Sequence, residues 1–376
     1  MEILFWAAAG LLAYTYGGYP LILWAWGTLS GRTSRKQSIE PKVTLLIAAY
    51  NEEKVIAQKL ENSLSLDYPR EKLEIVVASE STDNTNTIVQ GFAPQGIILR
   101  AFPERVGKAA MLHVSVPDAG GEIVVFSDAN ALYERDALRK LVSHFADERI
   151  GCVSGQLEYE DYKRNPTETT EGLYWRYEAW VKRLETRLFS LLGANGSIFA
   201  LRKALYAPLS PTRGDDFELP VRVLLQGYGV VLEAEAISRE KPTETTSAEF
   251  RRRIRISSGM FPSAWVLAGE AVRCRAGFTL FQLVSHKFLR WLSALFLLML
   301  LVTNAALAGS FYQLAFGLQA LFYGLAFLGW LLDGRGNVVP MLFQLPYYFC
   351  AIHVAATWGV AKAFISPPPP EWEQAR

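Results

Sequence analysis

The sequence predicts an α/β domain with a doubly wound, mostly parallel sheet, joined at both ends to α-helical membrane segments. Between about Pro41 and Arg255, short apolar runs of strand length alternate with segments of helical pattern, which is the order of a parallel sheet covered by helices on both faces. Uncharged runs flank that region, each close to the ~20 residues that cross a bilayer core. Polar residues follow the apolar runs, and ligands of such sheets bind beyond the carboxyl ends of the strands.

Composition excludes several other classes of protein. The 376 residues include 38 Lys and Arg and 37 Asp and Glu, and this formal net charge of +1 excludes a protein that works mainly by wrapping nucleic acid. Hydrophobic residues make up 51% of the chain, which is too apolar for a disordered protein. Cys152, Cys274 and Cys350 are odd in number and far apart, so they predict neither a disulfide framework nor a metal cluster.

The first membrane segment is predicted within residues 1–30, because no charged residue occurs from Ile3 to Trp26. A signal peptide is the alternative. Such a peptide begins with basic residues, whereas Glu2 is the only charge before this run, and no cleavage motif follows it. Arg and Lys come after the run, between positions 32 and 36, and the positive-inside rule then places the next domain in the cytoplasm.

Further transmembrane helices are predicted within residues 287–364, in the uncharged runs Trp291–Ala308, Phe311–Leu332 and Met341–Ala361. Lys287 and Arg290 precede the first run, which again indicates a cytoplasmic start. Buried helices of a large soluble protein are the alternative, and several such runs in one chain disfavour it. The tail, residues 365–376, would end outside if every run spans and inside if one is re-entrant.

Residues 257–286 predict amphipathic helices at the membrane surface. Apolar side chains such as Trp265 and Phe278 are interleaved there with charged ones such as Glu270 and Arg273. An ordinary surface helix is the alternative interpretation.

The cytoplasmic domain is predicted over residues 40–256, with its first strands at Val43–Ala48, Leu73–Val77, Gly96–Leu99 and Ile123–Ser127. Polar residues follow three of these strands: Asn51 and Glu52, then Glu80 to Asp83, then Asp128 and Asn130. Because parallel strands end at one edge of a sheet, these turns should converge, which favours a ligand site over the ordinary polarity of strand ends.

Several of these residues suit phosphate chemistry. Asp128 at a strand end is a natural ligand for a hard divalent cation that also holds a diphosphate. Lys108, which follows Gly107, supplies a point charge for phosphate oxygens, although no Walker A loop surrounds it and a solvated lysine is the alternative.

Two charged groups in the second half have open interpretations. Asp215 and Asp216 begin a helical pattern, where they either cap the helix or hold a general base beside an acceptor hydroxyl. Capping is favoured from these residues alone. Four arginines crowd the start of the following segment, where they would attract anionic lipid headgroups or a phosphate leaving group; they are Arg251, Arg252, Arg253 and Arg255.

The series of motifs resembles that of the membrane-integrated family 2 glycosyltransferases, relatives of cellulose, chitin and hyaluronan synthases and of ceramide glucosyltransferase. The resemblance runs from about Val43 to Gly259, with membrane helices on both sides. It implies a GT-A fold, a nucleotide-sugar donor (usually a UDP-sugar), Mg²⁺ or Mn²⁺, and direct displacement at the anomeric carbon with inversion. The matching motifs are Ala49-Tyr50-Asn51-Glu52, Ser81-Thr82-Asp83, Gly107-Lys108, Asp128-Ala129-Asn130, Asp215-Asp216 and Arg252-x-x-Arg255.

The resemblance also implies a role for each motif residue. Tyr50, Asn51 and Glu52 would line the nucleoside pocket, and Lys108 would contact the donor phosphates. Asp128 would bind the metal, with Asn130 as a neutral second ligand. Asp216, beside Asp215, would be the base that deprotonates the acceptor, and Arg255, with Arg252, would stabilise the departing nucleoside diphosphate. Asp83 belongs to the donor-binding turn, in which Glu80 stands in for the usual base-contacting carboxylate.

Departures from the family pattern refine this expectation. The turn reads Ala78-Ser79-Glu80 where the family usually has Asp-Asp-Gly, and Ile256 stands where processive synthases have a tryptophan, which weakens any prediction of processivity. The sequence therefore predicts a metal-dependent, inverting glycosyltransferase of a bacterial inner membrane, acting on a lipid-linked or polysaccharide acceptor, with no nucleic acid partner. A degenerate membrane scaffold and a membrane nucleotidyltransferase are the alternatives.

Overall fold

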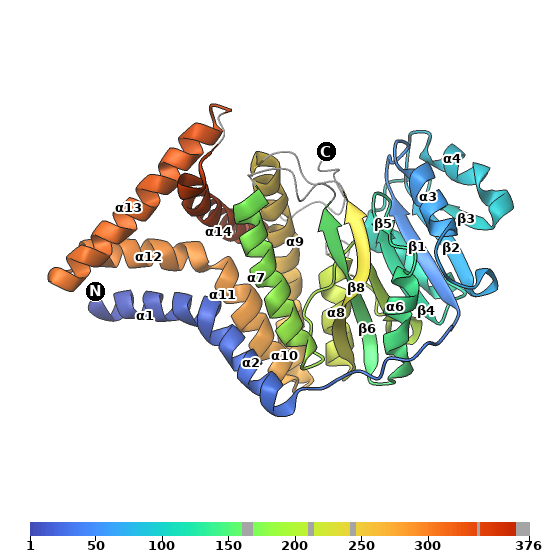
Figure 1. The fold of residues 1–376 in the computed structure, drawn as a ribbon, viewed down its shortest axis with the longest axis horizontal. Helices are drawn as coiled ribbons and strands as arrows, with labels where there is room; N and C mark the ends of the chain where they lie inside the picture. Colours follow the sequence, from blue (N-terminus) through green and yellow to red (C-terminus); the bar gives the residue numbers. More distant parts are fainter. Residues whose placement is uncertain (160–167, 210–213, 241–245, 337–338, 366–376) are drawn as a thin grey trace.

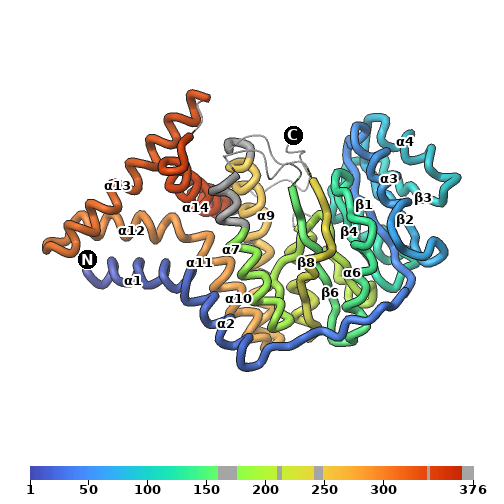
Figure 2. Tube along the Cα trace, viewed as in Figure 1, coloured from blue at the N-terminus to red at the C-terminus, as the bar shows by residue number. Residues whose placement is uncertain are grey.

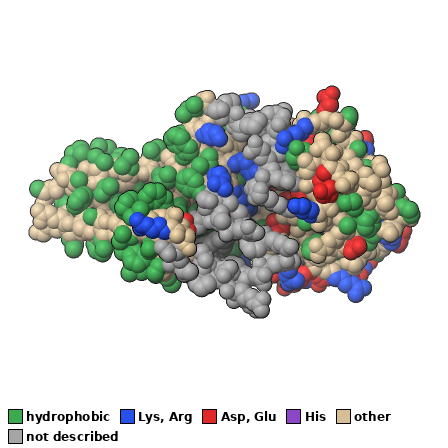
Figure 3. Space-filling view, turned by 90° about the horizontal axis from the view of Figure 1, so that it is seen from above, with side chains coloured by type: hydrophobic (Ala, Val, Ile, Leu, Met, Phe, Trp, Pro, Cys, Tyr) green, Lys and Arg blue, Asp and Glu red, His purple; other side chains and the backbone are tan. Residues whose placement is uncertain are grey.

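A computed structural model describes residues 1–159, 168–209, 214–240, 246–336 and 339–365 (Figure 1). The predicted tail therefore lies outside the described residues from 366 onward. A sheet domain forms one end of the molecule and long apolar helices form the other, with α7 (Glu168–Thr186) and α9 (Thr246–Arg273) between them. Hydrophobic side chains gather over the helical end, whereas charged side chains gather over the sheet domain (Figure 3).

The sheet has eight strands in the order β3-β2-β1-β4-β7-β6-β8-β5. The predicted first four strands are confirmed, and β3, β2, β1 and β4 pair in parallel. The rest of the sheet is mixed, because β7 runs antiparallel to both β4 and β6, β8 is parallel to β6, and β5 is antiparallel to β8. The strands are β1 Val43–Ala49, β2 Leu73–Ser79, β3 Ile97–Ala101, β4 Ile123–Asp128, β5 Leu132–Tyr133, β6 Ile150–Tyr159, β7 Phe199–Arg202 and β8 Gly229–Glu240.

Helices cover both faces of this sheet, as expected for a doubly wound fold. Alternate residues of a strand point to opposite faces, so Leu45 and Ile47 of β1 pack against α3 and α6, whereas Leu46 packs in the second core with α5 and α8. The covering helices are α3 Ile56–Leu64, α4 Thr85–Gly91, α5 Lys108–Asp118, α6 Ala137–Ser143 and α8 Asp215–Leu225. Short 3-10 turns, η2 to η5, lie at Arg70–Lys72, Ala93–Gln95, His144–Ala146 and Lys203–Leu205.

The N-terminal segment is helical from α1 (Glu2–Ala13) through the π-turn η1 (Tyr14–Gly18) to α2 (Tyr19–Ser30). Helix α1 lies beside α12 (Figure 1). From the end of α2 the chain passes α6 on its way to β1, and the Gln37 N–H donates to the Ser143 carbonyl on that path (Figure 2). This helical run covers the predicted anchor over Ile3–Trp26, but neither α1 nor α2, of 12 residues each, is among the described helices long and apolar enough to cross a membrane.

Two of the described helices, α13 (Ser310–Asp333) and α14 (Met341–Ile365), are long and apolar enough to cross a membrane. A third span is possible by the same criteria of length and composition if the pair Gly277–Trp291 and Ser293–Ala305, bent by 58°, counts as one. These elements correspond to the three predicted C-terminal runs. The bent pair comprises α10 Gly277–Gln282, η6 Leu283–Phe288, α11 Leu289–Trp291 and α12 Ser293–Ala305.

Helix α9 joins the sheet domain to the apolar helices. It runs without a break across the predicted boundary at residue 256, and it carries most of the predicted surface segment. Trp265 and Val272 are exposed on it while Leu267 and Ala271 are buried, so this part of α9 is amphipathic.

Gly359 allows α14 to approach α9 closely. A Cβ at this position would stand 2.7 Å from both the Ile254 carbonyl oxygen and the Ser257 Cβ. We expect Gly359→Ala to destabilise the helix pair by about 1–3 kcal/mol through overpacking, which a thermal melt in detergent would measure. Gly324→Ala on α13, where a Cβ meets nothing within 4 Å, is the matched control and should leave stability unchanged or slightly raised. Equal melting temperatures for the two variants would contradict the close approach.

Candidate active site

The predicted site residues gather at the carboxyl ends of β1, β2 and β4, where the turns after β1 and β2 are joined by hydrogen bonds. Asn51 has a left-handed backbone (φ 53°), and its Oδ1 accepts from the Thr82 N–H at 2.9 Å. The Asp83 carboxylate accepts from the Glu53 N–H at 3.3 Å and the Thr85 N–H at 3.0 Å. Burial acts to raise the pKa of Asp83, but these hydrogen bonds outweigh it and lower the pKa. Asn51 and Asp83 therefore shape the wall of the site.

Glu80 holds the loop that leads into α5. Its Oε2 accepts the backbone N–H groups of Val106 and Gly107, each at 2.7 Å. Gly107 has φ 83°, a conformation that favours glycine, and Lys108 begins α5 directly after it. The other oxygen, Oε1, is buried and has no hydrogen-bond partner among the described residues. Next to this loop, the Arg105 guanidinium lies 4.2 Å from the centre of the Tyr50 ring.

Lys108 lies between two carboxylates at the centre of the site. Its Nζ is 2.9 Å from Asp128 Oδ1 at the end of β4 and 3.3 Å from Asp215 Oδ1 in the first turn of α8. Burial would lower the pKa of Lys108, but the charges of Asp128 and Asp215 raise it above its ordinary value. The ammonium group therefore stays charged and joins three elements of the fold.

Asp216 lies next to this pair with a perturbed carboxylate. Burial and the charge of Asp215 raise the pKa of Asp216 to about 6, against the opposing charge of Lys108. Its two oxygens pack on glycines, because a Cβ at Gly214 would stand 2.8 Å from Oδ1 and one at Gly196 would stand 3.3 Å from Oδ2.

The two aspartates do not cap α8, although both lie in its first turn, where a negative charge interacts favourably with the helix dipole. Gly214 is the residue that caps α8, and no side chain among the described residues makes a cap hydrogen bond there. Burial raises the pKa of Asp215, and its Oδ2 is buried without a hydrogen-bond partner in the part of the chain that the structure describes. A buried carboxylate oxygen without a partner is unusual in a structural role, so the pair fits a chemical role better.

The two motif arginines lie on α9. Arg252 Nη1 is 3.2 Å from the Tyr159 hydroxyl and 3.4 Å from Glu249 Oε2, and both partners raise the pKa of Arg252 although burial opposes them. Arg255, one helical turn further along, is half-buried. Arg251 is exposed, so the arginine cluster does not face one way.

Sequence reasoning missed two charged groups on which the charge of Asp128 acts, the buried Lys59 and the half-buried Glu240. Lys59 is fully buried, donates to the Ala131 carbonyl, and lies 3.9 Å from the centre of the Tyr133 ring. Burial lowers the pKa of Lys59 to about 7, against the charges of Asp128 and Glu240. Burial also raises the pKa of Glu240 to about 7, and Asp128 adds to the rise.

One sequence signal could have found Lys59. It lies three residues after Ile56 and next to Leu60, on the face of α3 that packs on the sheet. Glu240 carried no such signal, because it ends β8, a strand that the sequence analysis did not predict.

The oxygen donors at the centre of the site fit a hard divalent cation. Asp128 and Asp215 both point toward Lys108, and the half-buried Asn130 follows Asp128 by two residues. Among the described residues, no group of three or more His, Cys, Asp and Glu side chains is arranged to hold a metal by itself. A cation bound at Asp128 would therefore take its remaining ligands from a phosphate group and water.

Comparisons with known proteins find a matching family model and several similar proteins. Residues 44–208 match the family model for glycosyl transferase family 2. The probable glycosyltransferase YdaM of Bacillus subtilis is 29% identical over 233 residues, which cover 58% of this chain and 55% of that protein. A beta-monoglucosyldiacylglycerol synthase of Synechocystis is 29% identical over 229 residues, covering 58% of this chain and 48% of that enzyme.

A poly-beta-1,6-N-acetyl-D-glucosamine synthase of Staphylococcus aureus is 25% identical over 226 residues, covering 58% of this chain and 54% of that enzyme. The chain thus spans about half the length of the curated relatives it matches. Among solved structures, a mannosyltransferase from Pyrobaculum calidifontis in complex with GDP-Man and Mn²⁺ has a TM-score of 0.72 at 22% identity. That match covers 96% of this chain and 99% of the other, so the two share their fold almost throughout.

Proposed function

We propose that the chain moves a sugar from a nucleotide-sugar donor to a membrane-associated acceptor, because residues 44–208 match the family model for glycosyl transferase family 2. The observation that carries the proposal is the central cluster, in which Lys108 joins Asp128 and Asp215 while Asp216 lies beside them with its pKa raised to about 6. Lys108 and Asp128 in this cluster suit a phosphate leaving group, and Asp216 suits the role of general base. Inverting transfer needs those two groups.

In the proposed reaction the bond between the anomeric carbon and the donor phosphate oxygen breaks, and its electron pair leaves on the nucleoside diphosphate. The acceptor oxygen forms the new bond to the anomeric carbon, and its proton passes to the Asp216 carboxylate. Attack from the face opposite the leaving group inverts the configuration. Asp216 works as a base near neutral pH because its raised pKa increases its affinity for the proton.

The donor would occupy the edge of the sheet. Lys108 would exchange a carboxylate partner for phosphate oxygens, and Arg252 and Arg255 on α9 would neutralise charge on the departing diphosphate. The Tyr50 ring, with the Arg105 guanidinium next to it, would form one wall of the nucleoside pocket. Glu52 and the buried Oε1 of Glu80 would complete the pocket. UDP is the nucleotide we expect, and GDP is the alternative, since the mannosyltransferase of the same fold was solved with GDP-Man.

Asp128, with Asn130 after it, would hold Mg²⁺ or Mn²⁺. When bound, either ion supplies positive charge that stabilises the leaving diphosphate. The acceptor would be a lipid or a polysaccharide at the membrane surface, as the names of two relatives suggest. We place the domain on the cytoplasmic side of a bacterial inner membrane.

A product assay tests this function. Detergent-solubilised protein is incubated with a panel of UDP- and GDP-sugars and membranes, and released nucleoside diphosphate and pyrophosphate are both measured. Nucleoside diphosphate is expected. Pyrophosphate would indicate a nucleotidyltransferase instead, and neither product, together with no donor binding by calorimetry, would indicate a non-catalytic scaffold.

The pH dependence of transfer should follow Asp216. Its pKa lies above that of an ordinary carboxyl, so the base is protonated and inactive below about pH 6. We expect kcat/KM to fall about tenfold per pH unit below that point and to level off above it. Initial rates between pH 4.5 and 8 measure this, and an acid limb near pH 4 would show that the base is another carboxylate.

A further inference from the structure

Two lysines from different helices approach the loop that contains Gly193 and Asn195, and the Ala194 N–H of this loop donates to the Asp216 carbonyl oxygen at 2.8 Å. Lys182 on α7 donates to Asn195 Oδ1 at 2.9 Å. Lys287 on η6 approaches the same loop, because a Cβ at Gly193 would stand 4.0 Å from its Nζ and 3.9 Å from the Asp216 carbonyl oxygen. We call Lys182 and Lys287 the lysine pair.

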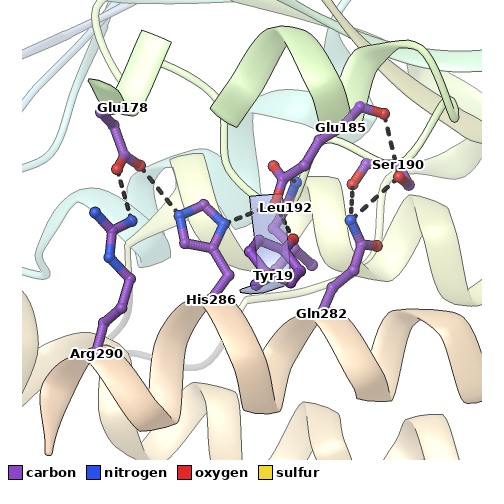
Figure 4. A network of polar contacts seen from close by, with 8 residues as sticks. All are labelled: Tyr19, Glu178, Glu185, Ser190, Leu192, Gln282, His286 and Arg290. Atoms are coloured by element: carbon purple, nitrogen blue, oxygen red, sulfur yellow. Dashed lines mark hydrogen bonds and ion pairs between the residues drawn. The ribbon is translucent and has the colours of Figure 1, made fainter. Parts of the chain in front are cut away.

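The nearby carboxylates have other partners. Glu178 is 2.7 Å from Arg290 and 3.3 Å from His286, and Glu185 is 2.6 Å from the other ring nitrogen of His286 (Figure 4). Among the described residues, neither member of the lysine pair forms an ion pair. Both lysines are half-buried, and both approach the Gly193–Asn195 loop.

Electrostatics agrees with this geometry. Burial lowers the pKa of Lys182 and the charge of Lys287 adds to the lowering, whereas the charges of Glu178, Asp216 and Glu185 oppose it. A bound anion would offset the charge of Lys287 at Lys182.

The lysine pair lies on the side of Asp216 that faces the apolar helices. Lys287 lies in the first limb of the bent pair that could form a membrane span, and its Nζ is 5.4 Å from the centre of the Phe217 ring. Helix α7, which carries Lys182, stands between the sheet and the apolar helices (Figure 1). The donor phosphates are expected at the sheet edge, where Lys108 and not the lysine pair would contact them.

We propose that the lysine pair binds a phosphate group of the acceptor, and that the acceptor is therefore an anionic lipid with its reacting hydroxyl near a phosphate. The proposal rests on the proposed function, because it assigns the acceptor side of the site to the base Asp216. Ammonium groups suit phosphate oxygens as point charges, and charge-assisted hydrogen bonds in a poorly solvated site are strong. A neutral acceptor such as diacylglycerol would bring no negative charge to the lysine pair.

Direct binding tests the subsite with defined probes. The full chain in a non-ionic polyoxyethylene detergent is titrated with fluorescent phosphatidic acid, which has the phosphate but no acceptor hydroxyl, and with fluorescent diacylglycerol, which has the hydroxyl but no phosphate. We expect saturable binding of phosphatidic acid at least about tenfold tighter than that of diacylglycerol. Lys182→Met and Lys287→Met should each weaken it about tenfold, the size expected for losing one hydrogen bond to a charged group.

Lys72→Met is the matched control, since Lys72 lies on the surface in a pair with Glu40 and also removes one positive charge. It should bind like the wild type. In a separate titration, inorganic phosphate is added as a competitor of fluorescent phosphatidic acid. Displacement of the lipid by an equal concentration of phosphate would show that the site prefers a free phosphate to a lipid one. Equal affinity of the wild type for the two lipids would overturn the proposal even if a lysine variant failed to fold.

Transfer assays then separate the acceptor side from the donor side. Phosphatidic acid should inhibit sugar transfer to the membrane acceptor in the wild type and about tenfold less in the lysine variants, while the KM for the donor stays unchanged. A rise in the donor KM would instead assign the lysines to the donor diphosphate and overturn the proposal. Loss of all nucleoside diphosphate release in the wild type would contradict the proposed function, whereas the binding titration reports on the subsite independently.

Discussion

Asp216→Asn is expected to lower the rate of sugar transfer about 10²- to 10⁴-fold, which is the usual contribution of a general base. The amide has nearly the shape of the carboxylate, so it still fits between Gly196 and Gly214, but it does not accept the acceptor proton. Donor binding should stay close to that of the wild type, because Lys108 keeps both of its carboxylate partners. Nucleoside diphosphate release and calorimetric titration of the donor measure the two effects.

The matched control for this variant is Asp118→Asn. Asp118 is a surface carboxylate that pairs with Arg100 and lies at the other end of α5, so its variant should have wild-type turnover. Asp215→Asn offers a second comparison, since it removes one partner of Lys108 and should raise the donor KM. Normal turnover by Asp216→Asn would show that the base is elsewhere.

The second large effect is expected at Asp128. We expect Asp128→Asn to lower kcat/KM about 10²-fold or more, because the carboxylate is both the proposed metal ligand and the partner that orients Lys108 at 2.9 Å. EDTA should stop product release by the wild type, and Mg²⁺ or Mn²⁺ should restore it. The variant should respond weakly to either ion across the same concentration range.

A comparison with Asp136→Asn controls for the loss of one carboxylate, since Asp136 pairs with Lys140 on α6, away from the site. Unchanged turnover of the wild type in EDTA would remove the metal from the mechanism. In that case Lys108, held at a raised pKa by its two carboxylates, would be the cation that contacts the donor phosphates.

Much of the first half of the domain could be predicted from the chain alone. The strands β1 to β4 are short apolar runs that end in polar turns, so their positions along the chain and their shared edge follow from local pattern, and Asp128 and Glu80 were placed correctly at that edge. The second half was not predicted, because β7 turns back between β4 and β6 and makes the sheet mixed. Pairing of that kind depends on contacts between distant segments, which periodicity does not record.

The residues of the site likewise fall into those that could be predicted from the sequence and those that could not. Lys108, Asp128 and Asp216 stood out as residue types at strand and helix ends, whereas Lys59 and Glu240 were missed because their interaction with the charge of Asp128 depends on how the elements pack. A capping and dipole role of Asp215 and Asp216 was favoured from the residues; the capping part was wrong because Gly214 occupies the cap position, whereas both aspartates do lie in the first turn.

The sequence by itself determined which segments are apolar enough for a membrane, where the parallel strands end and which residue types stand at those ends, because these properties depend on neighbours along the chain. Only the tertiary structure decided that one ammonium group joins Asp128 to Asp215 and that Lys182 and Lys287 approach one loop beside Asp216. These groups come from separate elements, and their chemistry depends on distance and burial. Both quantities arise only when the elements pack together.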